Sequence, residues 1–255
     1  EVSNSKAKVL QDFGIINDLI ATDFDEDGQV DIIAVGEWTN IGMFKNTNGV
    51  FKDVSSEYGL DTVKGWWYTI AATDVNNDGH KDYIIGNVGE NIKFKATKEK
   101  PFKIFANDFD TNGTLDIVLS NDYNGEYVPV RGKECSTQQM PFISEKFKKY
   151  EDFANASLND IYGNKLYAGY NREATTFSSI ILVNNGKGGF KITKLPKQAQ
   201  AFPMLGIALL DYNIDGFEDI ITVGNIYDTE VETPRLDGGN GLVLLSNKKD
   251  GYIPL

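Results

Sequence analysis

Four stretches of the chain share one spacing of oxygen-bearing side chains: loop 1 (residues 23–31), loop 2 (74–82), loop 3 (108–116) and loop 4 (211–219). Each follows the pattern D-x-[DN]-x-[DN]-G-x-x-D, with carboxylates or amides at positions 1, 3, 5 and 9. The glycine at position 6 permits a sharp turn that gathers these oxygens around one point. Such an oxygen cage suits a hard cation such as calcium, which takes about six to eight oxygen ligands.

We expect each loop to bind one calcium ion through the side chains at positions 1, 3, 5 and 9 and through the backbone carbonyl at position 7. The expected ligands are, loop by loop, Asp23, Asp25, Asp27, Gln29 and Asp31; Asp74, Asn76, Asp78, His80 and Asp82; Asp108, Asp110, Asn112, Thr114 and Asp116; and Asp211, Asn213, Asp215, Phe217 and Asp219. This assignment predicts about four Ca²⁺ sites, with loop 3 weaker because Asn112 replaces a carboxylate. The alternative is that the loops are Asx turns without a metal.

The sequence around the loops argues against the EF-hand, which begins with the same pattern. An EF-hand needs a bidentate glutamate at position 12 and a helix on each side of the loop. Position 12 is instead Ala34, Ile85, Leu119 or Thr222. The flanks are short, β-branched apolar runs, which are typical of buried strands. The repeated unit is therefore strand, loop, strand.

Short strands repeated along the chain indicate an all-β fold. Units of roughly 40–60 residues built from antiparallel strands are typical of β-propeller blades. We expect a single β-propeller domain, or a fragment of one, over 1–255, with four legible blades near 10–60, 61–101, 102–200 and 201–255. The third blade is long because apolar residues within 138–163 fall at helical spacing, which predicts a helical insertion.

The loops with their flanking strands resemble the FG-GAP/VCBS repeat family, whose calcium-loop blades also form the head of integrin α chains. Shorter phrases resemble the large VCBS-repeat proteins exported by Bacteroidetes-type bacteria, often with an ASPIC/UnbV module: Gly36-Glu37-Trp38, Gly65-Trp66-Trp67, Gly86-Asn87, Gly113-Thr114-Leu115-Asp116 and Leu195-Pro196 with Ala199-Gln200. The resemblance implies a calcium-binding propeller that is secreted, extracellular or displayed on the bacterial outer-membrane surface. Family propellers commonly have about seven blades, so it also implies that other chains or blades complete the ring. The alternative is a small ring that closes within this chain.

The composition narrows the chemistry further. The net charge is −12, and the loop carboxylates account for much of it, which argues against nucleic-acid binding. Cys135 is the single cysteine, so no disulfide forms within the chain. His80 is the single histidine, which disfavours Ser-His-Asp catalysis and histidine-rich zinc sites. No apolar stretch is long enough to predict a membrane span.

A second surface is expected at the rim opposite the acidic loops, where the connections after each blade's second strand come together. The candidate ligand face comprises Glu37, Trp38, Trp66, Trp67, Asn87, Asn91 and Tyr227. Aromatic side chains beside amides and carboxylates suit sugars or a partner's loop. The alternative is that these tryptophans pack between blades.

We therefore expect a non-catalytic, calcium-stabilised binding module for protein or glycan partners at the cell surface, and we assign no catalytic residues. One alternative is a structural subunit of a large surface assembly. The other is a carbohydrate-active lyase or hydrolase on a propeller scaffold, with Glu37, Glu90, Asp122 and Glu230 as its candidate acids. The fold alone does not decide among the three.

Overall fold

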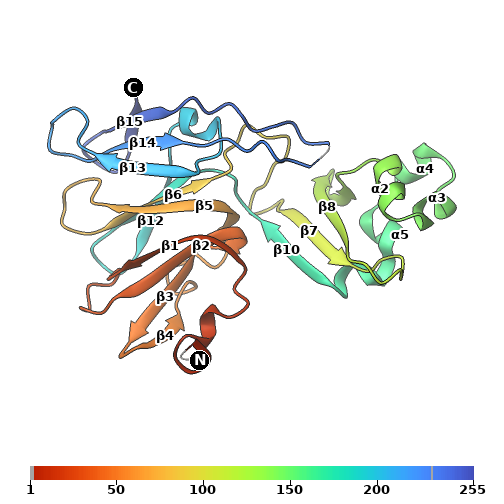
Figure 1. The fold of residues 1–255 in the computed structure, drawn as a ribbon, viewed down its shortest axis with the longest axis horizontal. Helices are drawn as coiled ribbons and strands as arrows, with labels where there is room; N and C mark the ends of the chain where they lie inside the picture. The colour runs from red at the N-terminus through yellow and green to blue at the C-terminus, as the bar shows by residue number, and fades with distance from the viewer. Residues whose placement is uncertain (1–2, 231) are drawn as a thin grey trace. The chain divides into compact units, whose positions relative to one another are not determined.

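The computed structural model describes residues 3–230 and 232–255. The chain divides into two compact units, which Figure 1 displays as a ribbon. Unit 1 comprises Glu1–Lys93 and Thr176–Leu255, and unit 2 comprises Phe94–Thr175. Unit 2 is therefore an insertion into the sequence of unit 1, and each unit is described by itself.

Unit 1 consists mainly of three antiparallel four-stranded meanders. Sheet I contains β1 (Ile15–Thr22), β2 (Asp31–Asn40), β3 (Gly42–Thr47) and β4 (Val50–Asp53); sheet II contains β5 (Lys64–Thr73), β6 (Asp82–Asn87), β11 (Ile180–Asn184) and β12 (Phe190–Lys194); sheet III contains β13 (Gly206–Leu210), β14 (Asp219–Val223), β15 (Leu242–Ser246) and β16 (Tyr252–Pro254). The far end of β2 also pairs with the start of β5, which joins sheets I and II along one edge. Short helical turns α1 (Ser3–Lys6), η1 (Lys8–Leu10) and η3 (Lys197–Gln200) complete the unit.

The three sheets stack as layers with sheet II in the middle, as Figure 1 shows, and β5 packs against both β1 and β13. Alternate residues of each sheet II strand point to opposite faces. Ile85 accordingly belongs to the core shared with sheet I, whereas its neighbour Ile84 belongs to the core shared with sheet III. Sheet II is apolar on both faces because both faces are covered.

These meanders confirm the predicted all-β character and the antiparallel sheets. Across the described parts of the chain, residues 3–230 and 232–255, the strands do not close into a ring. The sheets also group the strands differently from the predicted ranges 61–101 and 102–200. Because β11 pairs with β6, the segment after the insertion completes sheet II. The long sequence separation of these two strands concealed their pairing.

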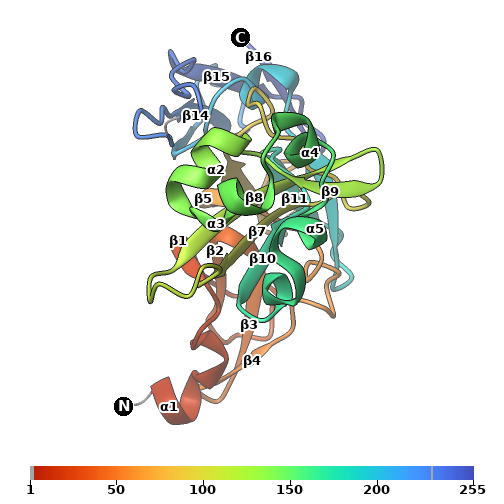
Figure 2. The ribbon, with the colours of Figure 1, turned by 90° about the vertical axis from the view of Figure 1, so that its right-hand side faces the viewer.

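Unit 2 contains its own sheet and a group of short helices. Sheet IV has the order β10-β7-β8-β9 and comprises β7 (Phe102–Asn107), β8 (Asp116–Tyr123), β9 (Glu126–Pro129) and β10 (Tyr170–Ala174). The helices are α2 (Lys133–Gln139), α3 (Phe142–Lys146), α4 (Tyr150–Ala154) and α5 (Leu158–Tyr162), followed by η2 (Gly163–Tyr167). Figure 2 shows the helices gathered beside the strands, and one apolar cluster joins Phe105 and Val118 of the sheet to Met140, Ile143 and Ile161.

Helices thus occur within the predicted segment 138–163, but they begin earlier and are shorter than one or two continuous helices. The backbone leaves the helical region at Met140 and again at Phe147, so α2 and α3 each end after a few residues. Pro141 follows the first break and is the N-cap residue that precedes α3. At α5, Ser157 and Asp160 form a capping box, which starts a new helix.

One buried amide holds the place where the chain leaves unit 1 for the insertion and returns. Asn87 is fully buried at the end of β6. Its Oδ1 accepts the backbone N–H groups of Trp66 at 3.2 Å and Val88 at 2.8 Å. Its Nδ2 donates to the carbonyls of Thr176 at 3.3 Å and Ser178 at 3.4 Å. Asn87 therefore fastens the outgoing and returning segments to each other and to β5.

Replacing this amide should destabilise the protein. Asn87→Ala leaves buried backbone groups without partners, so we expect the free energy of unfolding to fall by about 2–4 kcal/mol. Asn91→Ala is the matched control, because Asn91 is exposed and its side chain makes one hydrogen bond, to the carbonyl of Ala201. That variant should stay within about 0.5 kcal/mol of wild type. Urea unfolding measures both, and equal effects would contradict the assigned role of Asn87.

Candidate metal centre

The four loops share a hairpin geometry organised by the carboxylate at position 1. In loop 2, Asp74 accepts the backbone N–H groups of Asp78 at 3.0 Å and Gly79 at 2.8 Å. The same two hydrogen bonds recur in loops 1, 3 and 4, between 2.9 and 3.1 Å. Each loop joins the first two strands of its hairpin, as the sequence pattern predicts: β1 to β2, β5 to β6, β7 to β8 and β13 to β14.

The loop backbone is left-handed at positions 4 and 6. Position 6 is always glycine, with φ between 85° and 90°. Position 4 has φ between 55° and 62° and is occupied by Glu26, Asn77, Thr111 or Ile214. A β-branched residue such as Ile214 is a genuine outlier there, and its side chain is 90% exposed. The rest of the loop must therefore impose this conformation.

The aspartate at position 9 is buried in every loop and is held by backbone donors. Its Oδ2 accepts the N–H of position 2, as in the 2.9 Å bond from Val75 to Asp82. In unit 1 its Oδ1 accepts a second N–H from the third strand of the same sheet, at 2.7 Å each time: Asn46 to Asp31, Asn184 to Asp82 and Ser246 to Asp219. Position 9, at the start of the second strand, thus connects this strand to the loop and to the third strand.

Burial makes Asp31, Asp82 and Asp116 weaker acids. It raises the pKa of Asp82 to about 6, against the backbone hydrogen bonds from Asn184 and Val75 that lower it. Burial also raises the pKa of Asp31 and of Asp116. A bound divalent cation would favour the ionised form of each group.

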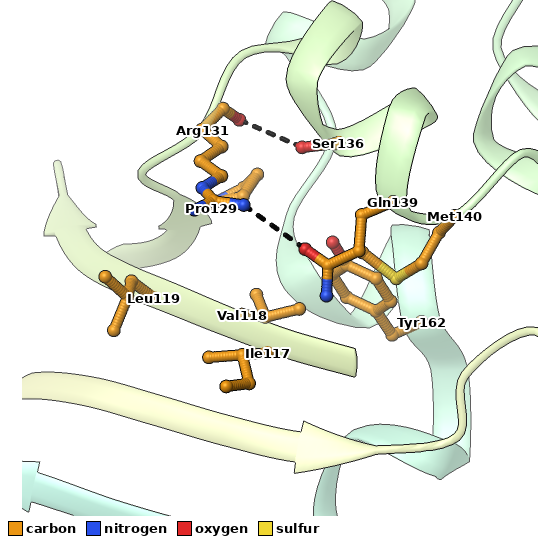
Figure 3. Close-up of a pocket in the computed structure, with 9 residues that line it drawn as sticks. All are labelled: Ile117, Val118, Leu119, Pro129, Arg131, Ser136, Gln139, Met140 and Tyr162. Carbon is orange, nitrogen blue, oxygen red and sulfur yellow. Dashed lines mark hydrogen bonds between the residues drawn. The ribbon is translucent and has the colours of Figure 1, made fainter. Parts of the chain in front are cut away.

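In unit 1 the position-9 aspartate accepts its second hydrogen bond from a strand backbone, whereas in unit 2 it interacts with a side chain. Gln139 at the end of α2 hydrogen-bonds Asp116 of loop 3. Figure 3 shows Gln139 from α2 beside Tyr162 from α5, with Arg131 donating to the Gln139 carbonyl at 3.4 Å. The cavity among them measures about 10 Å³, the size of about one water molecule. No sequence pattern had singled out Gln139.

Two loops bring three carboxylates together in a way that fits a cation. In loop 1, candidate ligand atoms of Asp23, Asp25 and Asp27 all lie within 4.8 Å of one another. In loop 3, the same holds for Asp108, Asp110 and Asp116. Within the described residues, Oδ1 of Asp25 is buried without a hydrogen-bond partner. A buried anionic oxygen without a donor is costly, and a calcium ion would satisfy it.

Loops 2 and 4 have asparagine at position 3, and its amide bridges to position 5. Asn76 donates to Asp78 at 2.8 Å, and Asn213 donates to Asp215 at 3.0 Å. The position-5 carboxylates also accept the N–H of position 7, as in the 2.9 Å bond from His80 to Asp78. The side chains expected as ligands at positions 1, 3 and 5 thus share one turn, whereas the position-7 carbonyls remain predicted ligands.

The loops of unit 1 also contact one another. His80 of loop 2 lies 2.5 Å from Glu26 of loop 1, between Nδ1 and Oε1. Asn77 of loop 2 donates to the carbonyl of Gly216 in loop 4 at 2.9 Å. Hydrogen bonding to Glu26 raises the pKa of His80. The single histidine therefore links two loops, in keeping with a structural role.

The predicted ligand face separates into internal and accessible residues. Trp67 is fully buried, and its Nε1 donates to the Thr39 carbonyl at 3.1 Å. Asn87 is the buried amide described above. Trp38 and Trp66 are half-buried with ring centroids 5.0 Å apart, and Glu37 precedes Trp38. Exposed Asn91 and Tyr227 lie elsewhere on the connecting segments of unit 1.

Three of the four candidate acids for an enzyme are bound to lysine. Glu90 accepts from Lys194 at 2.7 Å, Asp122 of unit 2 accepts from Lys100 at 2.7 Å, and Glu230 accepts from Lys93 at 3.0 Å. Burial opposes ionisation of Glu230, but hydrogen bonds from the Thr233 hydroxyl and Lys93 lower its pKa to about 2. A carboxylate whose pKa is lowered in this way, as in Glu230 and Asp122, is a poor general acid.

The anchoring role of position 9 can be separated from metal binding. In the presence of a chelator, Asp82→Ala leaves the N–H groups of Val75 and Asn184 without acceptors. We therefore expect the free energy of unfolding to fall by about 2 kcal/mol at pH 7. Asp78→Ala, at the exposed position 5, should cost less than about 1 kcal/mol under the same conditions. Urea unfolding with chelator measures the two variants.

The same comparison has a pH dependence. The pKa of Asp82 in the folded protein, about 6, exceeds its ordinary value of 3.8. Stability from protonated Asp82 is therefore present at low pH and lost as the pH rises through 6. The margin of wild type over Asp82→Ala should be about 1 kcal/mol larger at pH 5 than at pH 7. A margin that grows with pH would contradict this assignment.

Comparison with known proteins agrees with the loop geometry. None of the described helices is long and apolar enough to cross a membrane. No curated protein matches the chain. Residues 23–85 match the family model of the FG-GAP-like repeat, which covers loop 1, loop 2 and the strands between them. This match confirms the resemblance to FG-GAP repeat proteins: residues 23–85 form an FG-GAP-like repeat.

Proposed function

We propose that this chain is a calcium-stabilised, non-catalytic binding module, part of an FG-GAP β-propeller that works outside the cell or on the bacterial outer-membrane surface. Its partners are a protein or a glycan. The FG-GAP-like repeat at residues 23–85 and the convergent carboxylates of loops 1 and 3 support the calcium sites. Calcium is abundant outside cells, so even weak sites are filled there.

The outer faces of the stacked sheets support a larger propeller. Apart from Asp219, which accepts backbone N–H groups, the side chains on the face of sheet III that points away from sheet II are apolar: Ala208, Leu210, Ile221, Val223, Val243, Leu245 and Ile253. Val223 and Ile253 are more than half exposed. The outer face of sheet I presents Ile16, Leu19, Ala21 and Ile32 in the same way. Strands that are apolar on both faces are typical of covered sheets, so further blades, from this polypeptide or another, would continue the stack.

The backbone of Trp38 is the observation that carries the binding role. Trp38 has φ 59°, a left-handed conformation that is strained for so large a residue. It lies where the register between β2 and β5 shifts, so β2 bulges at this residue. Bulges that re-aim a side chain are frequent at functional sites. This bulge sets Trp38 against Trp66, whose ring lies 5.0 Å from Phe177.

This aromatic row suits a partner that offers a flat apolar surface, either a sugar ring or an aromatic side chain. Glu37 adds a half-buried carboxylate next to Trp38. A structural role in a surface assembly is the second candidate, favoured by the apolar outer faces. The lysine partners of Glu90, Asp122 and Glu230 weigh against the enzyme alternative.

Calcium should raise the thermal stability. Saturating one site about a hundredfold over its Kd contributes about 2.7 kcal/mol, which corresponds to a rise in Tm of about 5–10 °C for a protein of this size. Differential scanning calorimetry of the chelated protein, with calcium or magnesium added back, measures the effect. A Tm that calcium leaves unchanged would refute the calcium sites.

The binding role predicts an unusual result for Trp38→Gly. Glycine adopts φ 59° without strain. Because this relief offsets much of the lost ring packing, the free energy of unfolding should change by less than about 1 kcal/mol. Affinity for a partner found on a glycan array or by pull-down should fall at least about tenfold. Tyr212→Ala, which removes a half-exposed aromatic side chain from loop 4, is the control. If Trp38→Gly unfolds readily and still binds, the ring serves packing.

A further inference from the structure

A lysine of the neighbouring strand β3 contacts two carboxylates of loop 1. Lys45 of β3 hydrogen-bonds Asp25, and its Nζ lies 2.9 Å from Oδ2 of Asp27. These carboxylates occupy positions 3 and 5, and their Oδ atoms belong to the convergent group of loop 1. The hydrogen bond from Lys45 lowers the pKa of Asp27, and the two carboxylates raise the pKa of Lys45. The ammonium group thus binds two of the oxygens that a cation would use.

The hydrogen bonds of position 9 identify the equivalent residue in each sheet. In sheet I the residue after Lys45, Asn46, donates its N–H to Asp31. The corresponding donors in sheets II and III are Asn184 and Ser246. The residues that precede those donors are Val183 and Leu245. Of these three equivalent positions, the one in sheet I alone carries a positive charge.

The lysine accompanies an extra carboxylate. Loop 1 has four carboxylates in its ligand set, because Asp25 stands where loops 2 and 4 have Asn76 and Asn213. Loops 2, 3 and 4 have three carboxylates each. Adding the charge of Lys45 brings loop 1 to the same net charge as the others. Asp25 and Lys45 therefore form a charge-balanced pair that the other loops lack.

We infer that Lys45 is a tethered cation that holds loop 1 in shape without calcium and competes with calcium for Asp25 and Asp27. The inference rests on the proposed calcium-binding function. A calcium ion at this loop needs the oxygens that Lys45 binds, and two cations a few ångströms apart repel each other. The Lys45 side chain is 33% exposed, so it can turn out to solvent when calcium binds. Loop 1 is then the calcium site that fills last, despite having the most carboxylates.

Lys248, near loop 4, provides a comparison for the contact of Lys45 with two carboxylates. Lys248 lies 3.2 Å from Asp215 of loop 4, and its side chain is 53% exposed. It contacts a single carboxylate in a loop that has no extra one. Lys45 instead bridges two carboxylates, and charge-assisted hydrogen bonds of this kind are the strong ones.

The test needs a separate signal from each loop, which the position-6 glycines provide. Their N–H groups donate to the position-1 carboxylates, so the amide resonances of Gly28, Gly79, Gly113 and Gly216 report loops 1 to 4. Protein labelled with ¹⁵N-glycine is titrated with calcium after chelation. In wild type, Gly28 should respond at the highest calcium concentration. In Lys45→Met its midpoint should fall about tenfold, because a competing charge-assisted contact is gone.

Three further variants keep the outcome decisive. Lys45→Arg retains the charge and should keep the high midpoint. Lys194→Met removes a lysine that pairs with Glu90, a residue of none of the four loops, and it should leave all four midpoints unchanged. The double variant Asp25→Asn with Lys45→Met gives loop 1 the composition of loop 2, so its midpoint should approach that of Gly79. This variant also remains informative if Lys45→Met alone fails to fold.

The possible failures are distinguishable. If no glycine amide of wild type responds to calcium, the proposed calcium-binding function is refuted and the inference with it. If Gly79, Gly113 and Gly216 respond normally while Gly28 has the same or a higher midpoint in Lys45→Met, only the inference is refuted. Without calcium, Lys45→Met should also have a lower Tm than wild type, because four carboxylates then face one another uncompensated.

Discussion

The hairpins of unit 1 depend on a buried aspartate that accepts two backbone N–H groups at once. Asp31, Asp82 and Asp219 each connect the start of an acidic loop to the third strand of the same sheet. A buried carboxylate is costly unless it is hydrogen-bonded, so each sheet forms around a group that must find both donors. The conformation of each loop is therefore fixed by hydrogen bonds from the sheet to position 9, as well as by the glycine at position 6.

This arrangement divides the work within each loop. The carboxylates at positions 1 and 9 mainly accept hydrogen bonds from backbone N–H groups, and these bonds fix the turn. Positions 3 and 5 lie nearer the surface and supply the variable charge: two carboxylates in loop 1 and one carboxylate with one amide in each of the others. If the loops bind cations as proposed, positions 3 and 5, together with neighbours such as Lys45, would mainly set the affinity of each loop. The shape of the loop depends much less on these residues.

The sequence predicted the parts of the fold that repeat. The acidic pattern located all four hairpins, and the apolar runs beside them located the paired strands, because both signals are local. The pairing of β11 with β6 could not be predicted, since the whole of unit 2 separates the two strands in the chain. Gln139 was missed for the same reason: its contact with Asp116 depends on the packing of α2, and a lone glutamine carries no pattern.

The site residues divide along similar lines. Side chains whose role follows from loop position, such as Asp74 and Asp78, lie where the pattern places them. The ligand face was predicted from topology alone, which brings residues to one rim but does not say which of them are internal. Trp67 and Asn87 are internal because a β-bulge at Tyr68 and the entry to unit 2 draw them into the core. Trp38, at the bulge between Glu37 and Thr39 of β2, is only half-buried.

The central claim is that these acidic hairpins bind calcium. Native mass spectrometry of the chelated protein, before and after calcium is returned, tests it most directly by counting ions on each chain. Four bound calcium ions, the last at the highest concentration, are the predicted result. A chain that carries no calcium at millimolar concentrations, where extracellular sites of this class are filled, would contradict the account.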